Sequence, residues 1–490
     1  MPVSSQRRCQ IPGIGPGRRL DHREAMTMAD THDRLDLPLA GLRSEFDGEV
    51  IAPGDAGYDQ ARTVFIGGPD RRPVVILRPA GTSQVARVVT LARESGLPLA
   101  VRCGGHSLSR YGVCDDGIVL DLSLMRALDI DVEHRTAWAQ TGLTAGAYTA
   151  AVGAYGLATG FGDTGTVGIG GLTLGGGIGY LVRKHGLTID NLLAAEVVTA
   201  HGEVRHIDAA TEPELFWAIR GGGANFGVVT RMKFRLHEIP TIVGGMLMLP
   251  ATPKVVVSLV EEALAAPDEL TVMADIMVAP PLPFVPPEHH GTPAIMIRLC
   301  YAGATDAGER AVARLRGLAP PIVDLVRAMP YRGLYEMDEE YDQPLVAVRS
   351  MFVDSITLAD AETIIEQIRA TSAPMASVEL RPLGGAMARV HAEATAFAHR
   401  SRRVMATAAV IYKRSEDRPR HEAWVEHLAA AIRDGSCDSA YVNFLGNDGP
   451  SRLRCAYPGA TWDRLVAIKR RYDPGNLFRL NHNIPPGGTS

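Results

Sequence analysis

The chain has 490 residues, 46% of them hydrophobic, and a formal net charge of -5. That length and apolar content favour two domains with a core each, and the mixed charge without basic runs argues against a nucleic-acid partner. No apolar run reaches the ~18 residues of a membrane-spanning helix, so no membrane association is expected.

Residues 1–35 predict a disordered tail, because they are rich in Gly, Pro and Arg. They lack the apolar stretch of a secretory signal, so a cytoplasmic location is expected, and Met26 or Met28 is an alternative start. The six cysteines show no disulfide-like spacing. Cys103 and His106 could form half of a zinc site, but a second ligand pair is missing, so no metal is expected.

Residues 74–101 predict a strand, a helix and a second strand. Thr82 or Ser83 can cap the helix, its apolar face repeats at helical spacing, and Gly96 ends it. Further strands, here antiparallel, are expected over residues 117–122 and 128–142, followed by a small-residue helix at 143–156. These elements predict a mixed α+β domain.

The second of these strands runs into Gly104, Gly105 and His106. One interpretation is a tight turn with an incidental histidine. The other is a loop stripped of side chains so that a ligand can approach the imidazole. The sequence around it leaves both open.

Residues 164–179 have glycine at half of their positions, and one valine, two isoleucines and two leucines stand between the glycines. A flexible linker would lack those apolar anchors. Glycine in an anchored segment indicates the close approach of a ligand or of another backbone, and we favour a ligand. The match of residues 160–165 to GxGxxG is weak, because the flanking strand and helix are not predicted.

Residues 211–236 predict a helix with a Thr211–Glu214 capping box, a glycine break and a strand. From about residue 239 strands alternate with helices up to about residue 437, which predicts a second domain with a sheet backed by helices. A basic helix near the C-terminus is stopped by Asp473, Pro474 and Gly475.

Four stretches, in this order, resemble the berberine-bridge-enzyme-like branch of the vanillyl-alcohol oxidase superfamily. They are RCGGHS (102–107), TVGIGGLTLGGGIGYLVRKHGLTIDN (166–191), LFWAIRGGGANFGVVT (215–230) and YVNF with RRYDPGNLFRLNHNI (441–444 and 470–484). The resemblance implies an FAD-binding domain of the PCMH type over residues 36–240, a substrate domain with an antiparallel sheet over 241–437, and a return of the FAD-binding domain over 438–490.

The resemblance also implies a role for His106, covalent attachment to the 8α-methyl group of FAD. Free amides at Gly104 and Gly105 suit the pyrophosphate, and a bonded imidazole makes the flavin a stronger oxidant. The cofactor-binding residues that the resemblance implies are His106, Arg102, Cys103, Gly104, Gly105, Ser107, Thr164, Thr166, Val167, Gly168, Gly171, Gly177, Val228, Asn481 and Asn483.

Three positions depart from or refine the family pattern. Thr164 stands where many relatives have a second tether, a cysteine, so one covalent link is expected, with a less oxidising flavin and a narrower substrate range. Leu172 stands where relatives often have a histidine near the flavin. Val167 matches the position where a small residue lets oxygen reach the flavin, which favours an oxidase.

The catalytic base is not found in the family's place. Relatives often use the second tyrosine of a Tyr-x-Asn-Tyr run, and here that position is Phe444. Tyr441 is a weak substitute, and if the run is a strand it points away from Phe444. Further substrate-pocket candidates are Glu379, Arg381 and His399, each of which could equally have a structural role.

The resemblance implies an oxidase that transfers a hydride from an organic alcohol or amine to FAD and passes electrons to O2, giving hydrogen peroxide. A role in secondary metabolism is expected. Two alternatives stay open, a dehydrogenase with a quinone or protein acceptor and a non-catalytic flavin-binding protein. The expected partners are a small-molecule substrate and O2, and the expected state is a monomer or a homodimer.

Overall fold

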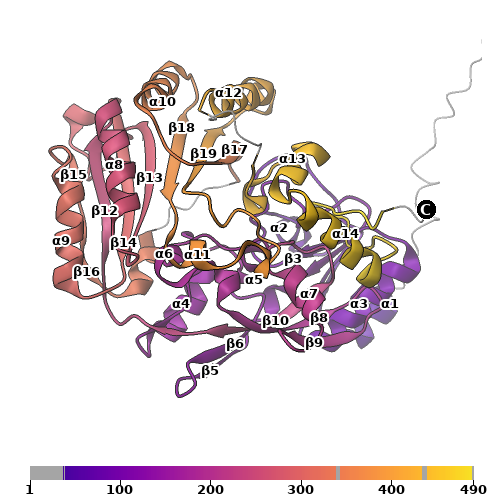
Figure 1. Cartoon of the computed structure of the whole chain (residues 1–490). Coiled ribbons are helices and arrows are strands. Elements are labelled where there is room, and N and C mark those ends of the chain that lie inside the picture. The colour runs from indigo at the N-terminus through magenta and orange to yellow at the C-terminus, as the bar shows by residue number, and fades with distance from the viewer. Residues whose placement is uncertain (1–36, 38, 338–342, 433–438, 488–490) are drawn as a thin grey trace, which may run out of the picture. The chain divides into compact units, whose positions relative to one another are not determined.

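The computed structural model describes residues 37, 39–337, 343–432 and 439–487 (Figure 1). By its internal contacts the chain divides into residues 1–45 and residues 46–490. In the first unit the described part holds one helix, α1 (Leu39–Glu45), and the predicted tail, residues 1–35, lies outside the described residues. All the sheets belong to the second unit.

A four-stranded sheet opens the second unit, in the order β1-β2-β4-β3. The β2, β4 and β3 strands are parallel, and β1 is antiparallel to β2. The strand expected over residues 117–122 is therefore present as β4, but its predicted antiparallel pairing is wrong, because β4 lies between the parallel strands β2 and β3. Helix α3 joins β2 to β3 and ends at Gly96, whose φ is 70°, so the predicted strand–helix–strand order is confirmed. The elements are β1 (Gly48–Ile51), α2 (Tyr58–Ala61), β2 (Val75–Pro79), α3 (Thr82–Ser95), β3 (Leu99–Arg102) and β4 (Ile118–Asp121).

A second, antiparallel sheet has the order β5-β6-β10-β8-β9, as the alternating pattern at residues 128–142 predicts. Its core includes the edge-to-face rings of Tyr148, Phe161 and Phe234. The elements here are β5 (Leu128–Asp131), β6 (Thr136–Gln140), α4 (Ala145–Gly153), β7 (Leu157–Ala158), α5 (Ile169–Leu174), α6 (Val182–His185), β8 (Leu192–Val198), β9 (Val204–Asp208), α7 (Pro213–Ile219), β10 (Val228–Arg235) and β11 (His237–Glu238), which pairs with β7.

Both predicted helix caps are wrong, because the side chains in question bind distant residues. The N-cap of α3 is Gly81, and the Thr82 hydroxyl donates to Glu196 Oε1 at 2.5 Å. The N-cap of α7 has no side-chain cap bond. Glu214 instead accepts two N–H bonds from Arg464, at 2.7 and 3.0 Å.

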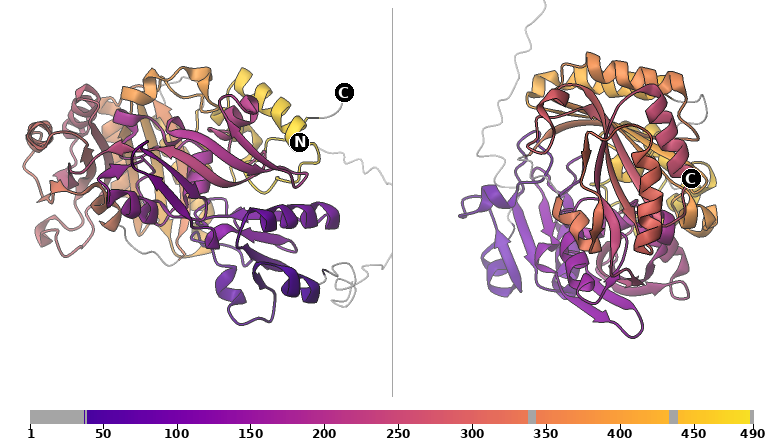
Figure 2. Two further views of the ribbon diagram at one scale, coloured as in Figure 1. Left: turned by 90° about the horizontal axis from the view of Figure 1, so that it is seen from below. Right: turned by 90° about the vertical axis from the view of Figure 1, so that its left-hand side faces the viewer.

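The third sheet is antiparallel, with strands along the path β15-β12-β14-β13-β18-β19-β17 and with β16 paired to β12. Helices α8, α9, α10 and α12 cover one of its faces (Figures 1 and 2), which confirms the predicted sheet backed by helices. The elements are β12 (Ile242–Pro250), α8 (Pro253–Ala265), β13 (Leu270–Val278), β14 (Pro293–Tyr301), α9 (Thr305–Arg316), β15 (Val323–Asp324), β16 (Arg327–Met329), β17 (Leu345–Val353), α10 (Leu358–Ala370), β18 (Met375–Pro382), α11 (Gly385–Arg389), β19 (Val404–Tyr412) and α12 (Arg418–Ala431).

The two faces of this sheet differ in chemistry because side chains alternate along a strand. The helix-covered face carries aliphatic side chains, for example Ile276, Ile297 and Leu380. The charged residues Asp275 and Arg298 stand one position away, on the other face. That face, which the four helices do not cover, supplies part of the cavity described below.

The C-terminal return, shown in yellow in Figure 1, adds α13 (Gly449–Ala456) and α14 (Ala460–Tyr472), and α14 contacts α7. Lys469 and Asp473 form an ion pair of 2.7 Å in which both side chains are fully buried. The Lys469 ammonium also donates to the carbonyl oxygens of Asn225 and Phe478, at 2.8 and 2.9 Å. One side chain thus anchors two loops of the cavity.

The described residues hold no helix that is long and apolar enough to cross a membrane. The mixed α+β class is confirmed, with parallel, antiparallel and helical parts. The boundaries at 240/241 and 437/438 stay predictions, although strand membership changes at the first of them, since every strand from β12 to β19 belongs to the third sheet.

Candidate active site

One cavity of about 500 Å³ gathers most of the residues that the sequence singles out. The first part of its wall comes from the end of β3 with the loop after it, the glycine-rich segment around α5 and residues 223–229. The rest comes from the face of the third sheet that α8, α9, α10 and α12 do not cover, from residues 441–444 and from residues 478–482. Segments more than 370 residues apart therefore share one cavity, which is the arrangement expected of a cofactor and substrate site.

His106 lies at the cavity wall because two loops meet there backbone against backbone. A Cβ on Gly104 would lie 2.3 Å from the nitrogen of Gly168, so only glycine permits that contact. The His106 ring stacks on Phe65 with its centroid 4.1 Å away. Burial lowers the pKa of His106 to about 4, against hydrogen bonding to the Thr166 backbone. The imidazole is therefore neutral at pH 7 and keeps a lone pair on one ring nitrogen.

The side chains next to His106 are engaged within the protein. Arg102 donates to Asp121 Oδ2 at 2.7 Å and to two backbone carbonyls. The Cys103 thiol packs on Gly170, and burial raises the pKa of the thiol to about 12. The Ser107 hydroxyl accepts the N–H of residue 111 at 3.4 Å. What Arg102 and Cys103 offer to the cavity is their backbone.

The glycine-rich segment lines the cavity with Thr164, Val167, Gly168 and Gly171. Several of its glycines make room for protein: a Cβ on Gly179 would lie 1.5 Å from a carbonyl oxygen. Gly171 differs, because a Cβ there would meet no atom within 4 Å. Close packing thus accounts for much of the glycine content, and Gly171 leaves open space.

Residues 441–444 form a 3-10 helix (Val442–Phe444) with Tyr441 as its N-cap, so the strand geometry considered for this run is wrong. Tyr441, Asn443 and Phe444 all line the cavity. The Tyr441 and Phe444 ring centroids lie 5.2 Å apart, and the guanidinium carbon of Arg381 lies 5.4 Å from the centre of the Phe444 ring.

The Tyr441 hydroxyl oxygen accepts three N–H bonds. They come from the backbone of Gly177 (3.0 Å), the backbone of Ile178 (3.3 Å) and Asn443 Nδ2 (2.9 Å). Burial raises the pKa of Tyr441, and these donors oppose the rise without cancelling it. The phenol is therefore neutral at pH 7, and among the described residues its proton has no acceptor.

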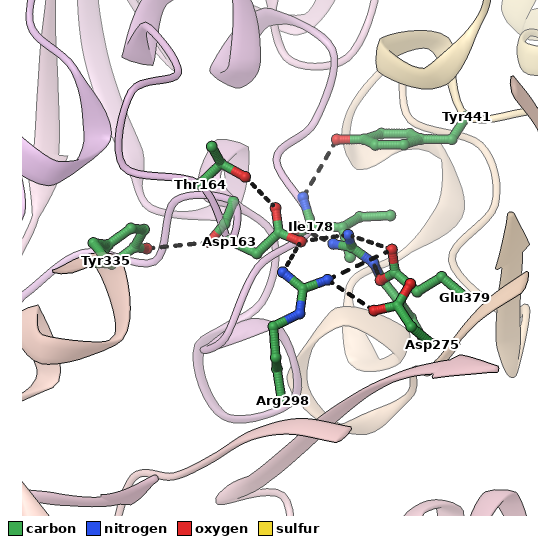
Figure 3. A network of polar contacts seen from close by, with 10 residues as sticks. Asp163, Thr164, Ile178, Asp275, Arg298, Tyr335, Glu379 and Tyr441 are labelled. Carbon is green, nitrogen blue, oxygen red and sulfur yellow. Dashed lines mark hydrogen bonds and ion pairs between the residues drawn. The ribbon is translucent and has the colours of Figure 1, made fainter. Parts of the chain in front are cut away.

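Two arginines and three carboxylates form a charged cluster beside Tyr441 (Figure 3). Asp163 Oδ2 accepts N–H bonds from Arg381 at 2.6 Å and from Arg298 at 3.3 Å. Arg298 also donates to Asp275 at 3.2 Å, and Arg381 Nη2 donates to Glu379 at 3.0 Å. Asp163, Arg298 and Arg381 line the cavity.

The carboxylates of the cluster differ in their tendency to ionise. Glu379 on β18 stands directly opposite Asp275 on the neighbouring strand β13. Burial raises the pKa of Glu379, the positive charge of Arg381 opposes this rise, and the negative charge of Asp275 adds to it. Burial also opposes the ionisation of Asp163, but Arg381 and Arg298 outweigh it and lower the pKa of Asp163. Asp163 is thus a carboxylate held by two guanidinium groups.

Comparison with known proteins agrees with this site. Family models described as FAD binding domain and as Berberine and berberine like match residues 73–208 and 440–485. The chain is 32% identical over 469 residues to (R)-6-hydroxynicotine oxidase of Paenarthrobacter nicotinovorans, covering 93% of this chain and 99% of that protein. The chain belongs to the berberine-bridge-enzyme-like family of FAD-linked oxidoreductases.

Solved structures of the family share the fold. 6-Hydroxy-D-nicotine oxidase of Arthrobacter nicotinovorans superposes with a TM-score of 0.81 at 29% identity, covering 92% of this chain and all of that chain. A glucooligosaccharide oxidase of Acremonium strictum, with a 6-S-cysteinyl, 8α-N1-histidyl FAD, has a TM-score of 0.79 at 23% identity, which supports the fold alone. As a member of this family the chain is an oxidoreductase with FAD as its cofactor.

The residues present fit FAD. In the described part of the chain, the backbone N–H groups of residues 104–108 donate to no acceptor, although they border the cavity. Such a run of free amides suits the anionic pyrophosphate. The Oδ1 atoms of Asn481 and Asn483 are buried without a partner, and Asn481 and Val228 line the cavity. Unmet polar atoms of this kind are expected where a cofactor supplies the missing partners.

Some candidates lie outside this cavity. His399 Nε2 donates to the carbonyl oxygen of Cys455 at 3.0 Å, its ring stacks on Phe352, and it does not line the cavity. Glu379, which accepts from Arg381, is also absent from the lining, as are Asn483 and Gly177. Thr166 borders a neighbouring hollow of about 590 Å³ that also touches His106.

Sequence reasoning missed Asp163, Asp275 and Arg298. A signal was present, because Asp275 and Arg298 are single charges inside the apolar strands LTVMADIMV and PAIMIRLCY. A charge buried in a sheet needs a partner, so two such strands predict an ion pair between them. Asp163 adjoins Thr164 in a loop, and its partner Arg381 is 218 residues away.

Proposed function

We propose that this protein is an oxidase that transfers a hydride from an organic alcohol or amine to FAD attached to His106, with O2 as the final electron acceptor and hydrogen peroxide as the product. The observation that carries the proposal is the neutral, partly buried imidazole of His106, which borders the same cavity as Tyr441 and Arg381. An imidazole with a free lone pair is the form that can bond to the flavin methyl group.

The remaining cavity residues have roles that follow from their contacts. The amides of residues 104–108 hold the pyrophosphate, Gly171 leaves the open face, and Asn481 meets the cofactor with its unpartnered oxygen. FAD, when bound, supplies the two-electron acceptor that the side chains of the protein cannot provide. The enclosing loops exclude water from the reacting atoms.

Two positions refine the proposal. Thr164 lines the cavity where many relatives have a tethering cysteine; a hydroxyl does not form that thioether bond, so one covalent link is expected. Val167 lines the cavity with a partly exposed side chain, which supports access of O2. The similar hydroxynicotine oxidases are themselves oxidases by name.

Acid precipitation of the purified protein tests the tether. The yellow colour is expected to stay in the pellet, and His106→Ala is expected to release it into the supernatant while the far-UV circular dichroism is kept. A colourless wild-type pellet would contradict the tether.

A second assay tests the acceptor. The enzyme, reduced anaerobically with one equivalent per flavin of a substrate from a panel that includes 6-hydroxynicotine, is mixed with air-saturated buffer. Rapid reoxidation with one peroxide per flavin is expected. Reoxidation over minutes, accelerated by a quinone, would identify a dehydrogenase instead. A flavin that no member of the panel bleaches would favour a binding protein.

A further inference from the structure

Among the described residues, three arginines line the cavity, and the protein uses their side chains to different extents. Arg102 is held by Asp121 and by two carbonyl oxygens, and its side chain is 6% exposed. Arg381 donates to two carboxylates and to a carbonyl oxygen, and its side chain is 4% exposed. The third side chain, that of Arg298, is 27% exposed. It is therefore the cation of the cavity that a ligand reaches most easily.

Arg298 also keeps N–H groups that no described residue uses. A guanidinium group has five N–H donors, and that of Arg298 makes two hydrogen bonds, from Nη1 to Asp163 at 3.3 Å and from Nη2 to Asp275 at 3.2 Å. Both are longer than the ~2.7–2.9 Å that is usual between charged groups. Each terminal nitrogen carries a second N–H group, and the two together suit the two oxygens of a carboxylate, which arginine commonly binds in this paired way.

The sheet places no carboxylate directly opposite Arg298. Its neighbours across the strands are Met246 on β12 and Met273 on β13. Asp163, which lies in a loop, is shared, because its Oδ2 atom also accepts from Arg381 at the shorter distance of 2.6 Å. On this part of the cavity wall two guanidinium groups thus face one carboxylate (Figure 3). The wall carries an excess of positive charge, which attracts an anion.

Two further carboxylates, Asp275 and Glu379, stand behind this wall. Both are buried and neither lines the cavity, so an anion in the cavity contacts the guanidinium groups and not these two side chains. Burial raises the pKa of Glu379, which lessens its negative charge. Burial opposes the charge of Arg298, but Asp275 and its other neighbours outweigh it and raise the pKa of the guanidinium. They keep Arg298 charged without occupying its remaining donors.

The cavity also has flat apolar surface beside the charged wall. Tyr441 and Phe444 line it with ring centroids 5.2 Å apart, and Leu172 and Ile178 line it as well. The guanidinium carbon of Arg381 lies 5.4 Å from the centre of the Phe444 ring, so the aromatic side chains adjoin the charged wall. An aromatic ligand that packs against these rings can direct an acidic substituent toward that wall.

We propose that Arg298 determines substrate specificity by binding a carboxylate of the substrate, and that the substrate is an aromatic acid whose alcohol or amine group is the one oxidised. The oxidation itself rests on the proposed function, whereas the acid site rests on the cavity alone. No bond is made or broken at the carboxylate, which stays an anion throughout. Arg298 therefore contributes to the binding of the substrate, and the rate of hydride transfer from a bound molecule does not depend on it.

Binding of benzoate and benzamide to the holoenzyme tests the acid site without any oxidation. The two molecules have nearly the same shape and differ in charge, and neither carries an alcohol or amine carbon that can be oxidised. By isothermal titration calorimetry, benzoate is expected to bind with a dissociation constant at least about tenfold lower, because hydrogen bonds between charged groups are the stronger ones. Benzoate is also expected to perturb the flavin absorption band. Equal or weaker binding of benzoate than of benzamide would overturn the proposal.

Arg298→Met and the control Arg349→Met assign the binding to one guanidinium group. Arg349 lies on β17 of the same sheet, pairs with Glu426 and Asp448, and does not line the cavity. Arg298→Met is expected to raise the dissociation constant of benzoate at least about tenfold and to leave that of benzamide unchanged, whereas Arg349→Met changes neither.

Arg298→Lys keeps the charge balance of the cluster, so it decides the question if Arg298→Met fails to fold. Lysine lacks the planar fork of arginine, and this variant is expected to bind benzoate severalfold more weakly than the wild type. Benzoate binding as tight as that of the wild type in either Arg298 variant would contradict the role of this residue.

Anaerobic stopped-flow bleaching of the flavin links the acid site to the oxidation. The compounds are 4-(hydroxymethyl)benzoate, 4-(aminomethyl)benzoate and the methyl ester of each. Each acid is expected to half-saturate the rate of flavin reduction at a concentration at least about tenfold lower than its ester, with similar limiting rates. Arg298→Met is expected to remove that difference.

The outcomes separate the acid site from the proposed function. Equal half-saturation by acid and ester would overturn the carboxylate site and leave the oxidase proposal standing. Tight binding of benzoate that Arg298→Met abolishes, in an enzyme whose flavin no compound of the wider substrate panel bleaches, would uphold the site and contradict the oxidase.

Discussion

Replacement of Lys469 by methionine tests how the C-terminal return supports the cavity. The Lys469 ammonium has three protons and uses each of them, on Asp473, on Asn225 O and on Phe478 O, within 2.7–2.9 Å. Methionine keeps the apolar length of the side chain but leaves the Asp473 carboxylate buried without its counter-charge. Removal of one partner of a buried pair costs about 3–5 kcal/mol, a large part of a typical stability of about 5–15 kcal/mol.

Urea unfolding followed by circular dichroism and flavin fluorescence measures that loss. Lys469→Met is expected to unfold at clearly lower urea and to load less FAD, because Asn225 and Phe478 line the cavity. Lys469→Met/Asp473→Asn is expected to regain part of the loss, since no charge then stays buried. Arg470→Met, at an exposed position of the same helix, is the control and should change stability by less than about 0.5 kcal/mol. A Lys469→Met variant within about 1 kcal/mol of the wild type would refute the reasoning.

Three further predictions concern the cofactor and the pH dependence. In a His106→Ala background, Thr164→Cys is expected to restore acid-stable flavin in part, seen by mass spectrometry; no retention would mean that residue 164 does not reach the ring. Val167→Leu is expected to slow reoxidation by O2 about tenfold or more while anaerobic reduction is unchanged, and equal effects on both half-reactions would contradict a gating role. Burial lowers the pKa of His399 to about 4, so the unfolded chain binds a proton at this residue more tightly than the folded chain does. The free energy of unfolding therefore falls as the pH drops from about 6.5 to 4, by up to about 1.4 kcal/mol per pH unit. Over that pH window the melting temperature of His399→Gln should fall less than that of the wild type, while its KM stays unchanged. If both proteins lose melting temperature equally with falling pH, His399 titrates with an ordinary pKa.

Local patterns in the sequence predict the elements well where neighbours in the chain decide the outcome. Residues 74–101 form the expected strand, helix and strand, and Gly96 ends α3 with a φ of 70°, since glycine adopts that conformation at little cost. The strands of the third sheet also follow from local sequence, because runs such as LTVMADIMV and PAIMIRLCY are apolar at nearly every position. The predicted caps at Thr82 and Thr211 fail because Glu196 and Arg464, far away in the chain, bind the side chains involved.

The candidate site divides in the same way. The loop around His106 can be recognised because its function resides in consecutive residues. The cluster of Asp163, Arg298 and Arg381 joins a loop to two strands, and only the sheet register brings the two arginines to one end of the cavity. An isolated charge in an apolar strand predicts that a partner exists, yet it does not say which one, because pairing depends on strand order and the order β14-β13-β18 is not that of the chain.

Tyr441 has a structural role, because its hydroxyl joins two distant segments of the chain. Its hydroxyl fixes the amides of Gly177 and Ile178 across 264 and 263 residues of sequence, and that contact joins the C-terminal return to the glycine-rich wall. A hydroxyl so placed is buried, and burial raises its pKa beyond the gain from the donors. With Phe444 in the neighbouring position, the cavity keeps aromatic faces and loses a proton acceptor. The comparison of an amine with an alcohol substrate therefore tests whether this buried hydroxyl also takes part in the chemistry.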